Sequence, residues 1–428
     1  MLVLGAYGLI GAACVRALKG HGIEVVGVGR SAASIRRSHL DIAWIEADIA
    51  RLSVDAWRKH LDEIDIVVNA AGALQDGSRD SLEAIHVTAV ERLCRALDGK
   101  STRVIQISAA GVSTDAPTAF FRSKARGDAI LQASGLDWII LRPTLVIGPA
   151  AYGGTALLRG VAGLPGIEAK VFHDRPVQTI GLTDLAEAVV SCAQGVMPMR
   201  RVYDLTEPDT RTFGEVVALV RAWLGQPPHR LSVPIPRLVL RLVCRLADGL
   251  GWLGWRTPLR TTALTTIENG VTGDPSTWRA AGGRDMAPLP DVLASMPATL
   301  QDRVFARLNL LCPLAIALLS VLWLSSGLIA LARVDAALEV LTMRGFGPDA
   351  ARAIVIGGAV ADIALGALIL YRPWARLACL GMAALALAYL AGATLFAPDL
   401  WADPLGPLIK VLPSIGLSLI AVSMLEDR

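Results

Sequence analysis

Three glycines near the start of the chain have the type and spacing of a phosphate-binding turn. Leu2-Val3-Leu4 is a short apolar strand, followed by Gly5-Ala-Tyr-Gly8-Leu-Ile-Gly11 and then by a helix-like stretch. Glycines let such a turn close tightly and let the backbone approach a pyrophosphate, whose charge then sits at the helix N-terminus. The pattern predicts a dinucleotide site. Its predicted contacts are Gly5, Gly8, Leu9, Ile10 and Gly11.

A positive charge follows the second predicted strand, which runs from Glu24 to Val28. A site that prefers NAD usually places an acidic residue here, on the ribose 2′-hydroxyl. This chain has Gly29-Arg30-Ser31 instead, and a guanidinium suits the 2′-phosphate of NADP(H). We therefore expect NADP(H) rather than NAD(H); the alternative is that Arg30 is an ordinary solvated loop residue.

Further strands recur at the spacing of an α/β fold, separated by helical patterns: Ala43 to Ile45, Asp65 to Val68, Arg103 to Ile107 and Trp138 to Leu141. This order predicts a doubly wound parallel Rossmann sheet with helices on both faces. Such a sheet binds its ligand at the carboxyl ends of the strands. The residues expected at that edge are Asp48, Asn69-Ala-Ala-Gly72 and Ser108.

The composition changes in the last third of the chain. The 428 residues are 53% hydrophobic and only 18% charged, which is too apolar for a protein that is soluble throughout. Leu308 to Ala332 carries no charge over 25 positions, enough to cross a bilayer. Three more predicted spans follow, at Ala353 to Tyr371, Leu377 to Ala397 and Leu405 to Leu425. A soluble bundle would need polar outer faces, which these segments lack, so we expect a four-helix transmembrane bundle.

Charge and cysteine placement narrow the expected partners and location. The net charge of +3 has no dense basic run, which gives no reason to expect nucleic acid, and the six cysteines lack the spacing of a metal site or disulfide framework. Arginines near the predicted spans favour one side, and we expect no export signal before the first domain. We expect a multi-pass protein of the inner (cytoplasmic) membrane with a cytoplasmic N-terminal domain. The favoured side has Arg303, Arg307, Arg372, Arg376 and Arg428; the other has Arg333, Arg344 and Arg352.

Residues 1 to 300 resemble the extended or atypical short-chain dehydrogenase/reductase superfamily, which includes NmrA-like proteins and the accessory subunit of respiratory complex I with this fold. The motifs that carry the resemblance are G-A-Y-G-L-I-G (5 to 11), E-A-D-I (46 to 49), N-A-A-G (69 to 72), I-S-A-A-G (107 to 111), F-F-R-S-K (120 to 124) and L-R-P-T-L-V-I-G-P (141 to 149). The resemblance implies that the three glycines cradle the pyrophosphate and that Asp48 touches the adenine. It also implies that Ala70 and Gly72 line the cofactor and that Lys124 holds the nicotinamide ribose.

The chemistry of that superfamily depends on a Tyr-x-x-x-Lys pair, in which the lysine lowers the pKa of a phenol that exchanges a proton with the substrate. Here the tyrosine position is Phe120, which has no proton to give. Ser108 and Lys124 remain as the expected catalytic residues. His86 stands where the family has an asparagine and is either a proton relay or a structural residue. Tyr152 is the nearest spare phenol in sequence.

The region from about residue 150 to 300 resembles the small substrate-side part of extended family members. Thr183-Asp184 and Thr212-Phe-Gly-Glu215 are expected to start helices. From Pro236 to Trp255 the chain is rich in Leu, Val and Trp, and Arg237, Arg241 and Arg245 repeat every fourth residue. This helix either lies on the inner membrane surface or carries a solvated arginine stripe.

Residues 305 to 428 resemble the DoxX-like membrane family, through W-L-S-S-G-L (323 to 328), D-I-A-L-G (362 to 366) and P-D-L-W-A-D-P-L-G-P-L-I-K-V-L-P (398 to 413). Some members are associated with quinone-linked redox chemistry, but the resemblance assigns no activity. Asp362 and Lys410 are the ionisable residues well inside predicted spans, where charge is costly unless paired. We expect the two to interact, with Arg333 as a further partner.

Two functions are compatible with these features. The first is a membrane-anchored, NAD(P)H-dependent oxidoreductase that acts on a hydrophobic carbonyl or quinone-like substrate, since hydride transfer to a quinone needs no tyrosine acid. The second is a protein that binds NADPH without turnover, as a redox sensor or an assembly factor for a membrane complex; the loss of tyrosine at position 120 favours it. The expected partners are the lipid bilayer and a hydrophobic small molecule.

Overall fold

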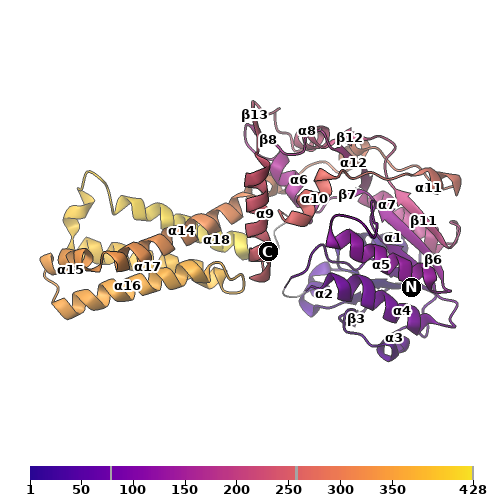
Figure 1. Ribbon diagram of the computed structural model, residues 1–428, viewed down its shortest axis with the longest axis horizontal. Helices are drawn as coiled ribbons and strands as arrows, with labels where there is room; N and C mark the ends of the chain where they lie inside the picture. The colour runs from indigo at the N-terminus through magenta and orange to yellow at the C-terminus, as the bar shows by residue number, and fades with distance from the viewer. Residues whose placement is uncertain (78–79, 256–258, 427–428) are drawn as a thin grey trace. The chain divides into compact units, whose positions relative to one another are not determined.

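The computed structural model describes residues 1–77, 80–255 and 259–426. The chain divides into two compact units. One comprises Met1–Arg245 with Thr257–Ala306, and the other comprises Leu246–Arg256 with Arg307–Arg428. The first unit holds the sheet and the second holds the long apolar helices (Figure 1).

A seven-stranded parallel sheet forms the first unit, in the order β11-β6-β5-β4-β1-β2-β3. Its strands are β1 (Leu2–Leu4), β2 (Val26–Gly29), β3 (Ala43–Glu46), β4 (Ile66–Asn69), β5 (Arg103–Ile107), β6 (Asp137–Pro143) and β11 (Arg201–Leu205). The predicted doubly wound sheet is confirmed. The strand order reverses between β1 and β4, which is where an open α/β sheet has its ligand crevice.

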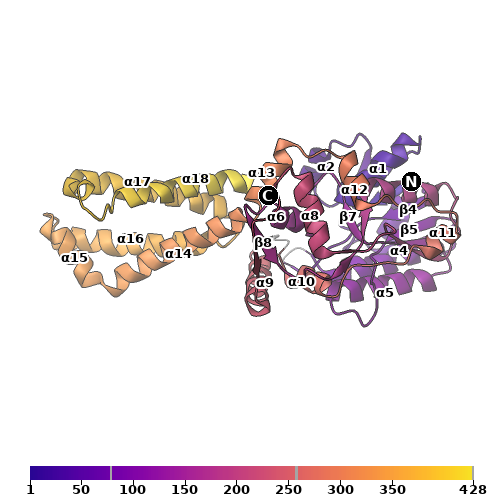
Figure 2. The ribbon, with the colours of Figure 1, turned by 90° about the horizontal axis from the view of Figure 1, so that it is seen from above.

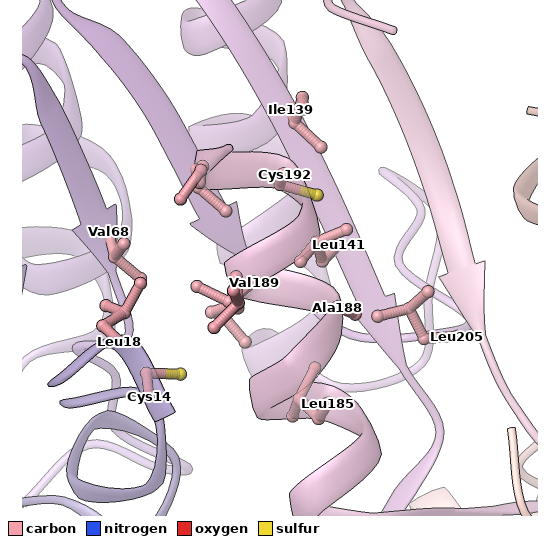
Figure 3. Packing of buried hydrophobic residues seen from close by; sticks show 14 of the residues in the cluster. Cys14, Leu18, Val68, Ile139, Leu141, Leu185, Ala188, Val189, Cys192 and Leu205 are labelled. Atoms are coloured by element: carbon pink, nitrogen blue, oxygen red, sulfur yellow. The ribbon is translucent and has the colours of Figure 1, made fainter. Parts of the chain in front are cut away.

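Helices cover both faces of this sheet because alternate residues of each buried strand point to opposite sides. Val3 packs with α1 (Leu9–Gly20) and α7 (Leu182–Ala193), whereas Leu2 and Leu4 pack with the opposite layer. Figure 3 shows Leu185, Val189 and Cys192 of α7 beside the sheet strands. The opposite layer contains α3 (Val54–His60), the π-helix η1 (Ala84–Thr88), α4 (Ala89–Leu97) and α5 (Ala119–Ala133). The helix after β2 is α2 (Ala32–Ser38).

Within the rest of the first unit, α6, α8 and α12 form a separate apolar core, while Ile180 of β10 and Trp278 of α11 pack into the core of the sheet. Its strands are β7 (Leu145–Ile147), β8 (Ile167–Lys170), β9 (Pro176–Val177), β10 (Thr179–Gly181), β12 (Arg211–Thr212) and β13 (Leu231–Pro234). Its helices are α6 (Gly154–Ala162), α8 (Phe213–Trp223), α9 (Arg237–Trp252), α10 (Thr261–Glu268), α11 (Ser276–Ala280), α12 (Leu289–Ser295) and α13 (Leu300–Leu308), of which α9 and α13 run into the second unit. The expected helix start at Thr212 is a capping box with Glu215. The start expected at Thr183-Asp184 lies one residue earlier, at Leu182.

The second unit consists of apolar helices that run alongside one another (Figure 2). They are α14 (Leu311–Ala332), α15 (Val334–Met343), α16 (Pro348–Leu368), α17 (Ala375–Phe396) and α18 (Leu412–Glu426), with short 3-10 turns η2 (Pro398–Trp401) and η3 (Ile409–Val411). Among the described residues, three helices are long and apolar enough to cross a membrane: Leu300–Ala332, Pro348–Leu368 and Ala375–Phe396. The fourth predicted span is shorter than expected, at Ile409–Leu425, because Gly406-Pro407 interrupts the apolar run before it.

Small residues bring α14 and α16 into close contact. A Cβ at Gly327 would lie 2.5 Å from the Ala359 carbonyl oxygen, and one at Gly366 would lie 2.8 Å from the Leu324 nitrogen. Glycines at such crossings let helix backbones approach within a membrane. The two helices therefore form a tight pair that no larger residue at either glycine would permit.

The expected interaction of Asp362 with Lys410 is wrong. Asp362 is buried and accepts hydrogen bonds from the hydroxyls of Ser326, at 2.7 Å, and Tyr389, at 2.9 Å. Lys410 is exposed on η3, and within the described part of the chain Asp362 forms no ion pair with it or with Arg333. Two hydroxyl donors from α14 and α17 satisfy the carboxylate in place of a cation, while Lys410 is exposed at the start of the last helical segment.

Candidate functional site

The glycine turn joins β1 to α1 with almost no space for side chains. Gly5 has φ +70°, and a Cβ there would lie 2.9 Å from the Ala71 Cα. The Gly8 amide donates to the Gly5 carbonyl at 2.8 Å, and a Cβ on Gly11 would come within 2.2 Å of the same oxygen. Gly8 precedes α1, whose first turn contains no acidic side chain. The first amides of a helix have no partner within it, so the turn offers N–H groups to an anion.

Arg30 and Asp48 lie at the carboxyl ends of the next two strands. Arg30 forms an ion pair with Asp80 at 2.7 Å. Asp48 follows β3 and accepts a hydrogen bond from the Ala50 amide at 3.1 Å. The structure thus gives Arg30 an acidic partner that lies 50 positions away in sequence and that sequence reasoning did not find.

The N-A-A-G segment follows β4 and approaches α5. Ala70 donates its amide to the Leu4 carbonyl at 3.2 Å. A Cβ at Gly72 would lie 3.3 Å from His86 Nε2 and 3.9 Å from Lys124 Nζ. Gly72 therefore brings the backbone of this turn next to the predicted lysine, and a side chain there would press against both groups.

Lys124 is buried, and its ammonium donates to the Ile107 carbonyl at 2.9 Å. Burial lowers the pKa of Lys124 to about 8, while the nearby Asp128 carboxylate acts in the opposite direction. The Nζ atom also lies 5.7 Å from the centre of the Phe120 ring. The lysine and the ring that replaces the tyrosine are therefore neighbours, in the arrangement that the spacing of positions 120 and 124 predicts.

His86 sits in the π-helix and uses both of its ring nitrogens. The Ala73 amide donates to Nε2 at 3.3 Å, and Nδ1 lies 2.8 Å from Ser123 Oγ. Burial and the charge of Lys124 lower the pKa of His86 to about 3, so the ring is neutral at physiological pH. With Nε2 accepting, Nδ1 carries the proton and donates it to Ser123, whose own hydroxyl donates to the Phe120 carbonyl. The imidazole thus links the N-A-A-G turn to α5 and has no free donor.

Ser108 belongs to a buried ionic group. Its hydroxyl donates to Asp128 Oδ2 at 2.7 Å, and Arg142 donates to the same oxygen at 3.1 Å. Burial raises the pKa of Asp128, while the contacts with Ser108, Arg142 and Lys124 lower it. The hydroxyl proton of Ser108 is therefore engaged in a hydrogen bond to the Asp128 carboxylate. Of the two expected catalytic residues, Lys124 is the one that lies next to Gly72.

Sequence reasoning missed Asp128, Arg142 and Ser123. Asp128 follows Lys124 by four residues on α5, which places both on one helix face, and this spacing was an available signal. Tyr152, by contrast, is 66% exposed and lies just before α6. Its backbone N–H donates to the Thr155 hydroxyl oxygen.

Two further features bear on ligand binding. A cavity of about 470 Å³ is lined by segment 170–175 with Ile235, Arg237 and Leu240, and it contains none of the predicted cofactor residues. Among the described residues, no group of three or more His, Cys, Asp or Glu side chains could hold a metal ion.

Known protein families match both units. Residues 5–165 match the family described as NAD(P)H-binding, which covers the glycine turn and α5. Residues 320–419 match the DoxX-like family, which covers most of the apolar helices. The chain joins an NAD(P)H-binding Rossmann domain to a DoxX-like domain. The predicted resemblance is confirmed on both counts, and the apolar helices of the DoxX-like domain make the chain a membrane protein.

Individual relatives of the NAD(P)H-binding domain are distant. It is 22% identical over 259 residues to the NADH-ubiquinone oxidoreductase 40 kDa subunit, mitochondrial, of Neurospora crassa, a match that covers 58% of this chain and 66% of the relative. The chain spans about half to two thirds of the length of the curated relatives it matches. The structure of the Bordetella bronchiseptica enzyme WbmG in complex with NAD superposes with a TM-score of 0.52 at 17% identity, covering 69% of this chain and 91% of WbmG. That likeness establishes the fold.

Proposed function

We propose that the chain is a membrane-anchored NAD(P)H oxidoreductase that passes a hydride to a hydrophobic, quinone-like acceptor. The observation that carries this proposal is the glycine turn, with Gly11 packed on the Gly5 carbonyl and α1 presenting its free amides at the strand reversal. In our proposal Gly5, Gly8, Leu9, Ile10 and Gly11 hold the pyrophosphate. Asp48, Ala70 and Gly72 line the rest of the cofactor, and Lys124 holds its ribose.

The proton chemistry around Lys124 favours a quinone over an aliphatic carbonyl. Bound NAD(P)H supplies the hydride. Phe120 has no proton, and the His86 and Ser108 protons are donated to Ser123 and Asp128. Reducing an aliphatic carbonyl leaves a strongly basic alkoxide that needs a positioned acid. A reduced quinone leaves a phenolate, whose conjugate acid resembles tyrosine with a pKa of about 10, and it takes its proton from water.

A second candidate is binding without turnover, as a redox sensor or an assembly factor for a membrane complex. The same hydrogen bonds favour it, because the His86 and Ser108 donors are engaged within the protein and are not available to protonate a substrate. By their names, one of the curated relatives is a subunit of NADH-ubiquinone oxidoreductase and two are subunits of NADH dehydrogenase (ubiquinone). A protein partner of this kind is therefore part of the second candidate.

Arg30 supports NADP(H) as the cofactor, although NAD is bound in the WbmG structure. Its guanidinium is held by Asp80 at 2.7 Å, so a 2′-phosphate would compete with that carboxylate for the same donors. The 2′-phosphate carries a charge of about −2 and the Asp80 carboxylate a charge of −1, so the phosphate is the stronger partner for the Arg30 guanidinium.

We further propose that the chain lies in the inner membrane with its NAD(P)H-binding domain in the cytoplasm. Arg303, Arg307, Arg372 and Arg376 lie near one end of the spans, whereas Arg333, Arg344 and Arg352 lie near the other end. The excess of arginine at the first end supports this orientation. We place the domain boundary between residues 300 and 305, as the sequence predicts.

The test is NADPH oxidation by the detergent-solubilised full chain with short-chain quinones and with aliphatic ketones. We expect turnover with quinones only, and we expect Lys124→Met to lower it while Lys59→Met, on an exposed helix, does not. Calorimetric titration of NADPH into the same samples separates the candidates. Binding without oxidation of any acceptor would replace the first candidate with the second, and no binding of NADPH or NADH would overturn both.

A further inference from the structure

Helix α9 (Arg237–Trp252) has three distinct faces. Leu240, Cys244, Ala247 and Gly251 recur every three to four residues and pack inward. Arg237, Arg241 and Arg245 form an exposed row beside them. The third face is apolar and faces solvent; its residues are Leu238, Val239, Leu242, Val243 and Leu246.

The exposure of the apolar face is high. Leu238 is 80% exposed, Leu242 58% and Leu246 62%. These three leucines lie four residues apart, so they form one continuous stripe. Each buried leucine contributes about 1.5–3 kcal/mol relative to an exposed one, and soluble proteins rarely leave such stripes uncovered. A covering partner is therefore needed.

The C-terminal end of α9 belongs to the membrane unit. Residues from Leu246 onward cluster with the apolar helices, and Trp255 donates its indole N–H to the Leu370 carbonyl at 2.6 Å. The Arg372 amide donates to the Leu253 carbonyl at 3.0 Å, and its guanidinium lies 5.6 Å from the centre of the Trp255 ring.

The loop that receives Trp255 connects α16 and α17, which are two of the membrane-crossing helices. Such a loop lies at the boundary between lipid and water, where tryptophan and arginine are enriched. The end of α9 is thereby held at that boundary, together with Trp252, which is also exposed.

We propose that α9 lies in the interface of the bilayer, with its apolar face at the acyl boundary and with Arg241 and Arg245 on anionic lipid head groups. An apolar face next to an arginine row is the composition of such helices, which enter the lipid by about 5–10 Å. A second copy of the chain is a poorer occupant, because a symmetric contact would bring the same arginine row against itself. This inference is independent of cofactor binding and goes beyond the proposed oxidoreductase.

The test uses the full chain in nanodiscs of phosphatidylcholine with phosphatidylglycerol. All six native cysteines are buried, so a nitroxide can be attached selectively at Leu242→Cys. Its accessibility to oxygen, which concentrates in lipid, is compared with that to a nickel chelate, which stays in water. Leu318→Cys on α14 is the lipid control, and Asp55→Cys on α3 is the water control.

We expect the oxygen-to-nickel ratio at position 242 to exceed that of the water control several-fold and to approach that of the lipid control. We expect it to fall toward the water control in the double variant Arg241→Glu with Arg245→Glu. A water-like ratio in the unreversed protein, or a label shielded from both reagents by another protein, would overturn the proposal. The proposal would also be overturned if the oxygen-to-nickel ratio at position 242 were the same in the charge-reversed variant, because the arginines would then not bind anionic head groups.

Discussion

Replacing Gly11 with alanine tests the most constrained contact of the cofactor turn. The new Cβ would lie 2.2 Å from the Gly5 carbonyl oxygen and 2.9 Å from its carbon, both backbone atoms that cannot rotate away. Gly20, at the other end of the same helix, has nothing within 4 Å of the corresponding position. Gly20→Ala therefore makes the same chemical change on α1 without the collision.

The size of the effect follows from two opposing contributions to stability. Alanine in place of glycine in a helix gains up to about 1 kcal/mol. Overpacking a tight contact costs about 1–3 kcal/mol, and here the turn must move by nearly one ångström. We expect Gly11→Ala to destabilise the first unit by about 1–2 kcal/mol net and to weaken NADPH binding by roughly tenfold or more, at 1.4 kcal/mol per tenfold. Gly20→Ala should be neutral or slightly stabilising.

Calorimetric titration of NADPH into the detergent-solubilised full chain measures the affinity, and thermal unfolding followed by circular dichroism measures Tm. If Gly11→Ala binds NADPH like the wild type, the turn does not hold the pyrophosphate and our reasoning fails. Equal losses in both variants would also refute it, because they would trace to helix α1 in general rather than to the contact with Gly5.

Three further outcomes are expected. Arg30→Ala should weaken NADPH more than NADH, by about tenfold for one lost charged contact, as measured by titration with both nucleotides. His86 has a folded pKa of about 3 against an ordinary 6.5, so it contributes stability that is present above pH 6.5 and is lost as pH falls toward 3. Between pH 6.5 and 3, His86→Asn should therefore lose less stability than the wild type, by a few kcal/mol, since each unit of pKa shift corresponds to about 1.4 kcal/mol. Tyr389→Phe removes one donor from buried Asp362 and should lower stability by about 1–2 kcal/mol in unfolding from detergent micelles.

Matched variants accompany each of these. Arg37→Ala, on the exposed side of α2, should leave the ratio of NADPH to NADH affinity unchanged. His60→Asn, at the end of α3, should leave the acid part of the curve as it is in the wild type. Tyr371→Phe, on an exposed ring, should not alter unfolding. An equal response in variant and control would contradict the corresponding prediction.

The sheet was predictable because its strands are buried on both faces and read as short apolar runs. The predicted Arg103 to Ile107 agrees with β5, and Leu2 to Leu4 agrees with β1. The short strands β9 and β12 were not predictable, since two residues carry no periodicity and their pairing depends on distant contacts. The π-helix was also missed. A Cβ at Gly127 would lie 2.0 Å from the His86 carbonyl oxygen, and only the packed structure reveals this approach.

The candidate site was predictable where motifs are local and missed where partners come from afar. The glycine turn and Lys124 lie inside continuous motifs. Arg30 and Asp80 are far apart in the sequence, so no local pattern predicts the ion pair between them. Asp128 looks like a solvated helix residue in sequence, and its burial against Arg142 depends on how α5 sits on the sheet.

The contact of Trp255 with the loop at Leu370 bears on where the two parts of this chain can be separated. Joining two genes end to end leaves each partner in one uninterrupted stretch of sequence. Here residues 246–255 lie within the first part of the sequence yet pack as part of the second unit. A DoxX-like domain that began at residue 307 would lack this indole and its hydrogen bond to the Leu370 carbonyl, so a cut at that point would remove a contact of the second unit.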